Sequence, residues 1–286
     1  MRQMRQILII GGGASGLTAA VSAARAGAKV TVLEQNKQAG KKLLVTGNGR
    51  CNLTNRNQEL SHYRGSSPEF IETALNAFGL TETLDFFQSL GIVTRDREGF
   101  LYPYSDQASS VADALRIEAE HLRVKLALNT RAKRICRENG RFLVETPGWT
   151  YEGDALILAA GSCAAPETGS DGSGYSFAKA MGHRVIEPLP ALVQLRAKEP
   201  EFPKLKGLRM EAGVSLFSGE VLLAEDRGEV QFTEYGLSGI PVFQVSRYGA
   251  AALSQGKKVR AVLNLLPFLR KEDQDAFWRK RIQAGG

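Results

Sequence analysis

The sequence predicts an α/β fold with a parallel sheet, joined to a second domain that is mainly β. A strand-length apolar run at Ile7–Ile10 leads directly into the glycine-rich turn Gly11–Gly16. Another apolar run, Ala155–Ala160, is typical of a central parallel strand covered on both faces. After Pro190 the pattern changes to short alternating runs separated by turn residues, which favours antiparallel strands. We therefore expect one domain over residues 1–189 and a second over residues 190–286.

The N-terminal glycines stand in the context of a complete βαβ unit. The alanine-rich stretch Leu17–Ala26 has helical character, and the strand-like run Lys29–Leu33 after it ends on Glu34. Strand, glycine-rich turn, helix, second strand and terminal acid together make the fingerprint of a Rossmann-like dinucleotide-binding domain.

Each position of this fingerprint has a physical task. Gly11 permits the tight turn, Gly13 lets the backbone approach a pyrophosphate, and Gly16 lets the helix lie against the strand. The helix N-terminus offers N–H groups and a partial positive charge to the pyrophosphate. Glu34 is placed to accept hydrogen bonds from ribose hydroxyls. The unit thus predicts cofactor contacts from Gly11, Gly13, Ala14, Ser15, Gly16, Glu34 and Gln35.

The predicted dinucleotide is FAD rather than NAD. The chain has one complete fingerprint, and an oxidoreductase with a dedicated NAD domain would show a second βαβ unit. Gly169–Gly174 is glycine-rich, but the G-x-G that begins at Gly172 lacks the third glycine of that motif at its required spacing, and no acid-ended strand follows. NAD(P)H stays a candidate for a transient electron donor.

Hydrophobic periodicity predicts the remaining elements. The predicted helices are Pro68–Phe78, Thr81–Leu90, Ser110–Leu122 and Phe268–Gln283. Ser67 caps the first of them, and Ser110–Asp113 matches a capping box. The predicted strands of the first domain beyond the βαβ unit are Ile92–Arg95, Phe100–Tyr104, Val124–Leu128, Arg131–Arg137 and Arg141–Thr146.

The composition is that of an ordinary globular protein with a basic surface. The 286 residues are 43% hydrophobic and 23% charged, with a net charge of +7. A pI near 9.4 would suit a nucleic-acid-binding protein, but the Lys and Arg residues are spread along the chain and no RNA-binding signature with stacked aromatics is found. We interpret the charge as a solvated surface that partly serves an anionic cofactor.

Cysteine usage indicates a reducing compartment, and hydropathy predicts no membrane span. Cys51, Cys136 and Cys163 are isolated, without a C-x-x-C pair or a metal-ligand spacing with the three histidines. No metal site is predicted. No stretch approaches the roughly 18 apolar residues of a membrane span, so we expect a cytoplasmic protein with no membrane partner.

Five segments resemble a known family. They are Gly40–Asn55, Leu158–Gly161, Thr168–Tyr175, Pro190–Val193 and Gly228–Gly239. These segments are distributed along most of the chain. They are similar to motifs of the HI0933-like flavoproteins (aminoacetone oxidase/BaiN type), which have a glutathione-reductase-like FAD-binding fold. The resemblance implies bound FAD and an inserted domain that begins near residue 190.

The resemblance also exposes two departures. The family has a C-terminal segment that returns to the FAD domain and helps to hold the flavin end, and we expect this chain to end before it, inside the inserted domain. Such a truncated chain should hold FAD weakly and form oligomers or aggregates. Glu234 stands where many relatives carry His, which affects substrate chemistry at that loop.

The loop after Glu34 supplies further predicted cofactor residues. Lys42 and Arg50 place positive charge where it can balance the pyrophosphate or a reduced, anionic flavin. Thr46, Gly47 and Asn52 supply small side chains and backbone groups, as a loop that wraps an isoalloxazine would need.

Other candidates come from the resemblance or from residue type. By resemblance, Ala132 lies on the strand that faces the adenine, and the turn Ala160–Gly161 closes over the dinucleotide. We expect Cys51 to pack or to contact the flavin rather than to relay electrons, because no partner cysteine lies close in sequence. Tyr235 and Ser238 could face substrate. His62, His121 and His183 have no triad partners and are interpreted as structural.

The predicted function is that of an FAD-dependent oxidoreductase, which transfers a hydride between a small organic substrate or NAD(P)H and bound flavin. The sequence does not choose among an amine oxidase, an enoyl or steroid-type reductase and another flavin dehydrogenase, and it identifies no catalytic residue. Two alternatives stay open: an FAD-dependent RNA-modifying protein, and a non-catalytic flavin-binding module.

Overall fold

The computed structural model describes residues 4–65, 67–199 and 202–284. The chain divides into two compact units, Met1–Val185 and Ile186–Gly286. Within the described ranges, no helix is both long and apolar enough to cross a membrane.

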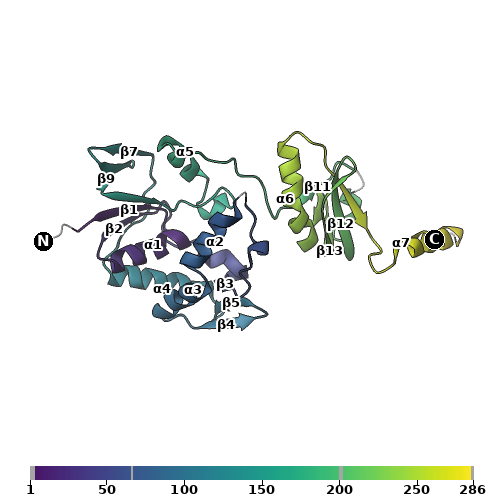
Figure 1. Cartoon of the computed structure of the whole chain (residues 1–286), viewed down its shortest axis with the longest axis horizontal. Coiled ribbons are helices and arrows are strands. Elements are labelled where there is room, and N and C mark those ends of the chain that lie inside the picture. Colours follow the sequence, from purple (N-terminus) through teal and green to yellow (C-terminus); the bar gives the residue numbers. More distant parts are fainter. Residues whose placement is uncertain (1–3, 66, 200–201, 285–286) are drawn as a thin grey trace. The chain divides into compact units, whose positions relative to one another are not determined.

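The first unit is built on a parallel sheet with the strand order β10-β1-β2-β6 (Figure 1). Its strands are β1 (Gln6–Ile10), β2 (Lys29–Leu33), β6 (Lys125–Ala127) and β10 (Ala155–Leu158). Leu8, Ile9 and Ile10 of β1 are all buried, because both faces of the sheet are covered. The prediction that the run from Ala155 forms a central strand is wrong. In the described sheet β10 is an edge strand, and its last residue, Leu158, is 38% exposed.

Two different layers cover the sheet. The helices α1 (Ala14–Arg25) and α4 (Ala108–His121) lie on one side in Figure 1, and β7 (Arg134–Glu138), β8 (Arg141–Glu145) and β9 (Thr150–Gly153) form an antiparallel sheet on the other. Side chains on a strand alternate between faces, so Ile9 packs with Val21 of α1 while Leu8 and Ile10 pack with Val144 of β8. The helix α5 (Ser173–Ala180) borders this second layer.

An excursion of mixed structure connects β2 to α4. It contains η1 (Leu43–Gly49), β3 (Thr54–Asn55), η2 (Leu60–His62), α2 (Pro68–Ala77), α3 (Leu80–Ser89), β4 (Thr94–Arg97) and β5 (Phe100–Pro103). The last two strands form the predicted antiparallel hairpin, and β3 pairs with the other edge of β5.

The start of α4 corrects a prediction. The helix begins at Ala108, so the prediction that Ser110 caps it is wrong. Ser110 lies inside the first turn, where its hydroxyl accepts a 2.9 Å hydrogen bond from Ser105 Oγ. Ala108 and Val111 are buried in the core, and this burial favours a helix that starts earlier than the capping pattern indicates.

The second unit is an antiparallel sheet with one packed helix. The strand order is β11-β14-β13-β12-β15. These strands are β11 (Leu195–Arg196), β12 (Arg209–Ser218), β13 (Val221–Thr233), β14 (Gly236–Ser238) and β15 (Arg260–Asn264), with η4 (Phe202–Leu205) before β12 and α7 (Lys271–Gln283) after β15. The two units confirm the predicted fold class, a Rossmann-type domain with a parallel sheet and a mainly β domain.

One helix of the second unit was not predicted. Residues Ile240–Ser254 form α6, which packs on β12 and β13 through Val242 and Val245. The prediction of strands alone for this region is therefore wrong. The signal was present, since Pro241 stands in the first turn and the buried positions recur every three or four residues.

Candidate functional site

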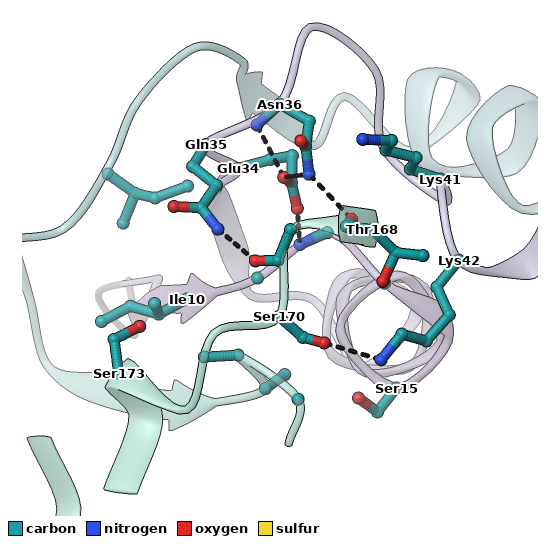
Figure 2. Close-up of a pocket in the computed structure, with 18 of the residues that line it drawn as sticks. Ile10, Ser15, Glu34, Gln35, Asn36, Lys41, Lys42, Thr168, Ser170 and Ser173 are labelled. Carbon is teal, nitrogen blue, oxygen red and sulfur yellow. Dashed lines mark hydrogen bonds between the residues drawn. The ribbon is translucent and has the colours of Figure 1, made fainter. Parts of the chain in front are cut away.

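A cavity of about 320 Å³ lies at the carboxyl ends of β1 and β2, which is where open α/β sheets bind their ligands (Figure 2). The predicted cofactor residues that line it are Gly11, Gly13, Ala14, Ser15, Glu34, Gln35, Lys42, Thr46, Ala132, Ala160 and Gly161. The predicted residues outside its lining are Gly16, Gly47, Arg50, Cys51 and Asn52. The fold thus gathers residues from three distant segments of the sequence around one space.

The glycines of the turn after β1 have different surroundings. A Cβ at Gly11 would lie 2.3 Å from the carbonyl oxygen of Ala159, and its φ of +101° already disfavours other residues. A Cβ at Gly16 would lie 1.8 Å from the carbonyl oxygen of Gly11, so that glycine lets α1 pack against the turn. At Gly13, by contrast, a Cβ would meet no heavy atom of the described residues within 4 Å. Gly13 therefore faces open space, as a position that a ligand approaches closely would.

The N-terminus of α1 gives this space a positive character. Gly13 is the N-cap, no side chain within the described structure caps the helix, and its first turn contains no acidic residue. The first N–H groups of a helix have no acceptor within the helix, and the helix dipole adds a partial positive charge there. The end of α1 is therefore suited to an anionic group such as a diphosphate.

Glu34, at the end of β2, ties the turn to the loop that follows. Glu34 is buried, with 7% of the residue exposed. Oε2 accepts a 2.7 Å hydrogen bond from the N–H of Gly12, while Oε1 accepts from the N–H and the side-chain amide of Asn36, at 2.8 and 2.7 Å (Figure 2). A carboxylate has about four lone-pair sites, so these three bonds leave one on Oε2 for a further donor.

The Glu167–Asp171 loop, which follows β10, forms another wall of the cavity. Asn36 donates to the carbonyl of Thr168 at 3.4 Å, and Gln35 donates to the carbonyl of Gly169. Lys42 Nζ donates a 2.7 Å hydrogen bond to Ser170 Oγ (Figure 2). Lys41, Asn36 and Ser170 were not singled out in the sequence. The loop itself left a signal, because it begins the glycine-rich run that does not complete a second fingerprint.

An ion pair secures the end of the same loop. Arg131 and Asp171 are joined at 2.6 Å. Hydrogen bonds from the side chain and backbone N–H of Ser173, together with Arg131, lower the pKa of Asp171 to about 2. The Asp171 carboxylate therefore stays charged at neutral pH and holds the loop to the segment that contains Ala132.

The Gly47–Asn52 loop closes on itself next to the cavity. Gly47, Asn48 and Cys51 all have positive φ. The N–H of Cys51 donates to the carbonyl of Thr46 at 2.9 Å, and a Cβ at Gly47 would lie 2.8 Å from the backbone N of Asn52. Cys51 is 3% exposed, and burial raises the pKa of its thiol. This thiol is a packed, neutral group, and a cofactor contact by the loop stays a prediction.

The candidates in the second unit have less specific surroundings. Glu234 is exposed and forms a 2.8 Å ion pair with Lys206. That pair lowers the pKa of Glu234 and raises the pKa of Lys206. Ser238 is 7% exposed in β14, so its hydroxyl does not present itself to solvent, while Tyr235 is half-buried. In the first unit, His62, His121 and His183 are all exposed.

Comparison with known proteins places the chain among named relatives. It is 47% identical over 266 residues to a protein of Clostridium scindens named 3-dehydro-bile acid delta(4,6)-reductase, covering 92% of this chain and 65% of the relative. It is 31% identical over 246 residues to the ribosomal RNA dihydrouridine synthase of Escherichia coli, covering 84% of this chain and 60% of that protein. The protein of the same name from Haemophilus influenzae is 29% identical over 87% of this chain and 62% of its own length.

The chain therefore spans less than two thirds of the length of these curated relatives. The family described as HI0933-like protein Rossmann domain matches residues 5–285, which is nearly the whole chain. The resemblance of the glycine-rich motifs is confirmed: the chain belongs to the HI0933-like Rossmann-domain family.

Proposed function

We propose that this chain carries the FAD-binding part of a flavin-dependent reductase. The observation that carries the proposal is the cavity at the N-terminus of α1, whose lining combines the open position at Gly13 with Glu34 and Lys42. Helix N–H groups, a cation and a ribose-binding acid are the donor and acceptor set that a dinucleotide requires.

Each part of the cofactor would have a partner among these residues. The N–H groups at the start of α1, together with Lys42 and Ser15, would hold the diphosphate. The remaining lone pair on Glu34 Oε2 would accept a hydrogen bond from a ribose hydroxyl. Ala132, which is buried and lines the cavity, would lie against the adenine side.

The names of the relatives point to one type of reaction. A bile acid delta(4,6)-reductase and a dihydrouridine synthase both act on a carbon–carbon double bond of a ring. In each case chemistry favours hydride addition, because a nearby carbonyl can take up the electron pair of the double bond. FAD, when bound, would supply that hydride chemistry. The protein would bind and orient the ring and keep water away from it, with NAD(P)H as the electron source. We therefore favour an enoyl-type reductase over an amine oxidase.

A ribosomal RNA substrate is the second candidate. Two relatives at 31% and 29% identity are RNA dihydrouridine synthases, and the chain has a net charge of +7. The 47% identity to the bile acid reductase favours a small-molecule substrate instead. RNA binding by this chain with affinity that falls steeply as salt rises would favour the RNA substrate.

The decisive experiment titrates FAD into the purified chain, because a weakly held cofactor would be lost together with the excess. We expect a shift of the flavin absorbance spectrum on binding, anaerobic bleaching by NADH or NADPH that a protein-free FAD blank does not show, and return of the oxidised spectrum on addition of a conjugated ring enone. Binding of NAD with no binding of FAD would contradict the proposal. Bleaching by primary amines, with no response to the enone, would favour an amine oxidase. Flavin that no donor reduces would favour a non-catalytic binding module.

A further inference from the structure

The β4–β5 hairpin of the first unit has one buried face and one exposed face. Leu101 and Pro103 are buried, so the neighbouring positions of β5 point the other way. In the register of the hairpin, Arg95 pairs with Tyr102, and Arg97 pairs with Phe100. We call the side chains on this second face the Arg–Tyr face; they are Arg95, Arg97, Phe100, Tyr102 and Tyr104, of which Arg95 and Tyr102 are half-buried and the other three are exposed.

The Arg–Tyr face is preorganised by contacts among its own side chains. The guanidinium carbon of Arg95 lies 5.1 Å from the ring centre of Tyr104, and that of Arg97 lies 5.8 Å from the ring centre of Tyr102. Asp106 Oδ2 accepts from both guanidinium groups. Such stacking fixes planar side chains without covering them: Phe100 is 47% exposed and Tyr104 is 64% exposed.

The Arg–Tyr face lies next to the lining of the cofactor cavity. Thr46 lines the cavity, and a Cβ at the next residue, Gly47, would lie 3.3 Å from Tyr102 Cε1. The N–H of Leu53 donates to the carbonyl of Leu101 at 2.8 Å, which fastens the loop after Gly47 to β5. In Figure 1, β3, β5 and β4 lie together at the lower edge of the first unit. The hairpin therefore presents aromatic and cationic groups directly beside the loop expected at the isoalloxazine.

The charge on the face matches a single anionic group. Two guanidinium groups share one carboxylate, which leaves one net positive charge among these interacting side chains. A nucleic-acid backbone is normally held by several cations, each of which neutralises a phosphate. An Arg fork, however, can grip one carboxylate through two parallel hydrogen bonds. The complement of this face is a small monoanion rather than RNA.

We propose that the Arg–Tyr face is the substrate-binding surface of this domain and takes an unsaturated ring compound with one carboxylate. This inference rests on the proposed reductase function, because the face lies beside the Gly47–Asn52 loop, which is the loop expected at the flavin. Tyr102 contacts the ring next to the cavity, and Arg97 pairs with the carboxylate. Burial of a ring against aromatic side chains supplies affinity, and the guanidinium supplies the preference for an acid.

The test compares two probes that differ only in charge: 3-oxochol-4-en-24-oic acid and its methyl ester. Equilibrium binding is measured by calorimetry on the full chain, with and without FAD. We expect the acid to bind about ten- to hundredfold more tightly than the ester, the range of a charge-assisted hydrogen bond. Arg97→Gln should remove most of that preference and Arg97→Lys should keep part of it. Tyr102→Leu should weaken both probes.

The control variant is Arg134→Gln. Arg134 is also an exposed, ion-paired arginine of the first unit, but it lies on β7 rather than on the β4–β5 hairpin. This variant should bind both probes as the unchanged chain does, and circular dichroism checks that every variant is folded. Equal affinity for acid and ester, or folded Arg97 and Tyr102 variants with unchanged binding, would overturn the proposal. So would an oligouridylate RNA that binds more tightly than the acid and loses affinity in Arg97→Gln.

The binding test of the Arg–Tyr face and the flavin test of the proposed reductase function can fail independently. Loss of flavin or absence of bleaching by NAD(P)H would count against the reductase. The preference for the acid can be measured on the chain without FAD, so its presence or absence judges the Arg–Tyr face by itself.

Discussion

Lys42 Nζ donates a 2.7 Å hydrogen bond to Ser170 Oγ and thereby joins the loop after β2 to the loop after β10. Both residues line the cavity at the N-terminus of α1. A dinucleotide diphosphate is a stronger acceptor than a hydroxyl because it is ionised. We therefore predict that Lys42 exchanges the Ser170 hydroxyl for the diphosphate when a dinucleotide binds.

Lys42→Met should weaken FAD binding by about ten- to hundredfold, because a charge-assisted hydrogen bond of about 1.5–3 kcal/mol is lost. Ser170→Ala should leave FAD affinity unchanged or slightly higher, since it removes only the competing acceptor. Flavin fluorescence during titration measures both. Lys37→Met, at an exposed lysine of the same segment, is the control. Equal affinities for the Lys42 and Lys37 variants would contradict this role.

Substitution of two glycines should separate folding from binding. Gly11→Ala should destabilise the chain by about 1–3 kcal/mol, because the new Cβ would overlap the Ala159 carbonyl. Gly13→Ala should fold with a loss of at most about 1 kcal/mol, since Ala is a poorer N-cap than Gly, but it should hold FAD poorly because its Cβ enters open space of the cavity. Urea unfolding without cofactor and the flavin-to-protein ratio after gel filtration measure the two effects. A Gly13→Ala variant that retains full flavin would argue against a close approach there.

Glu34→Ala should affect both stability and FAD affinity. The carboxylate accepts from three N–H groups of Gly12 and Asn36 in a buried position. Leaving buried donors without an acceptor costs about 1–3 kcal/mol. We expect a lower urea midpoint for the chain without cofactor, together with weaker flavin binding. Glu120→Ala, at an exposed position of α4, should change neither property. An unaltered urea midpoint in Glu34→Ala would show that water replaces the carboxylate.

The lowered pKa of Asp171, which results from hydrogen bonds from Ser173 and from the ion pair with Arg131, predicts a dependence of stability on acid pH. The pKa of Asp171 is lowered to about 2 in the folded chain, against about 3.9 in an unfolded one. Its contribution is therefore complete above roughly pH 5 and is lost as the pH falls through about 4 toward 2. The difference in urea midpoint between the unchanged chain and Asp171→Asn should be constant from pH 7 to 5 and shrink at pH 4 and 3. The matched variant Asp85→Asn, exposed on α3, should show no such narrowing.

The three cysteines should react with iodoacetamide at different rates. Cys163 is exposed, Cys136 is half-buried and Cys51 is buried. Burial raises the pKa of Cys51, and burial together with the charge of Glu138 raises the pKa of Cys136, so fewer thiolates form at either site. Mass spectrometry of the native chain should find Cys163 modified first and Cys51 last. Early modification of Cys51 would show that the Gly47–Asn52 loop opens readily.

The first βαβ unit could be predicted from the sequence because its signals are local. An apolar run, glycines at fixed spacing and an acid at the end of the next strand act within about 30 residues, and each has one physical purpose. The same reasoning predicted the β4–β5 hairpin and the charged C-terminal helix α7. The motif that begins at Gly47 also has a local cause, since successive residues with positive φ close a tight loop there.

Local patterns in the sequence could not predict which distant segments share a surface, because long-range packing sets these contacts. Lys42 and Ser170 are separated by 128 positions, and nothing in the periodicity of either segment predicts their contact. The edge position of β10 depends on strand order, and the early start of α4 depends on the burial of Ala108. The Arg–Tyr face is visible as alternation in the sequence, but its place beside Gly47 follows from the packing of β5 against the loop. Local propensity acts over a few residues, whereas the cavity and its neighbouring face are set by long-range burial and hydrogen bonding.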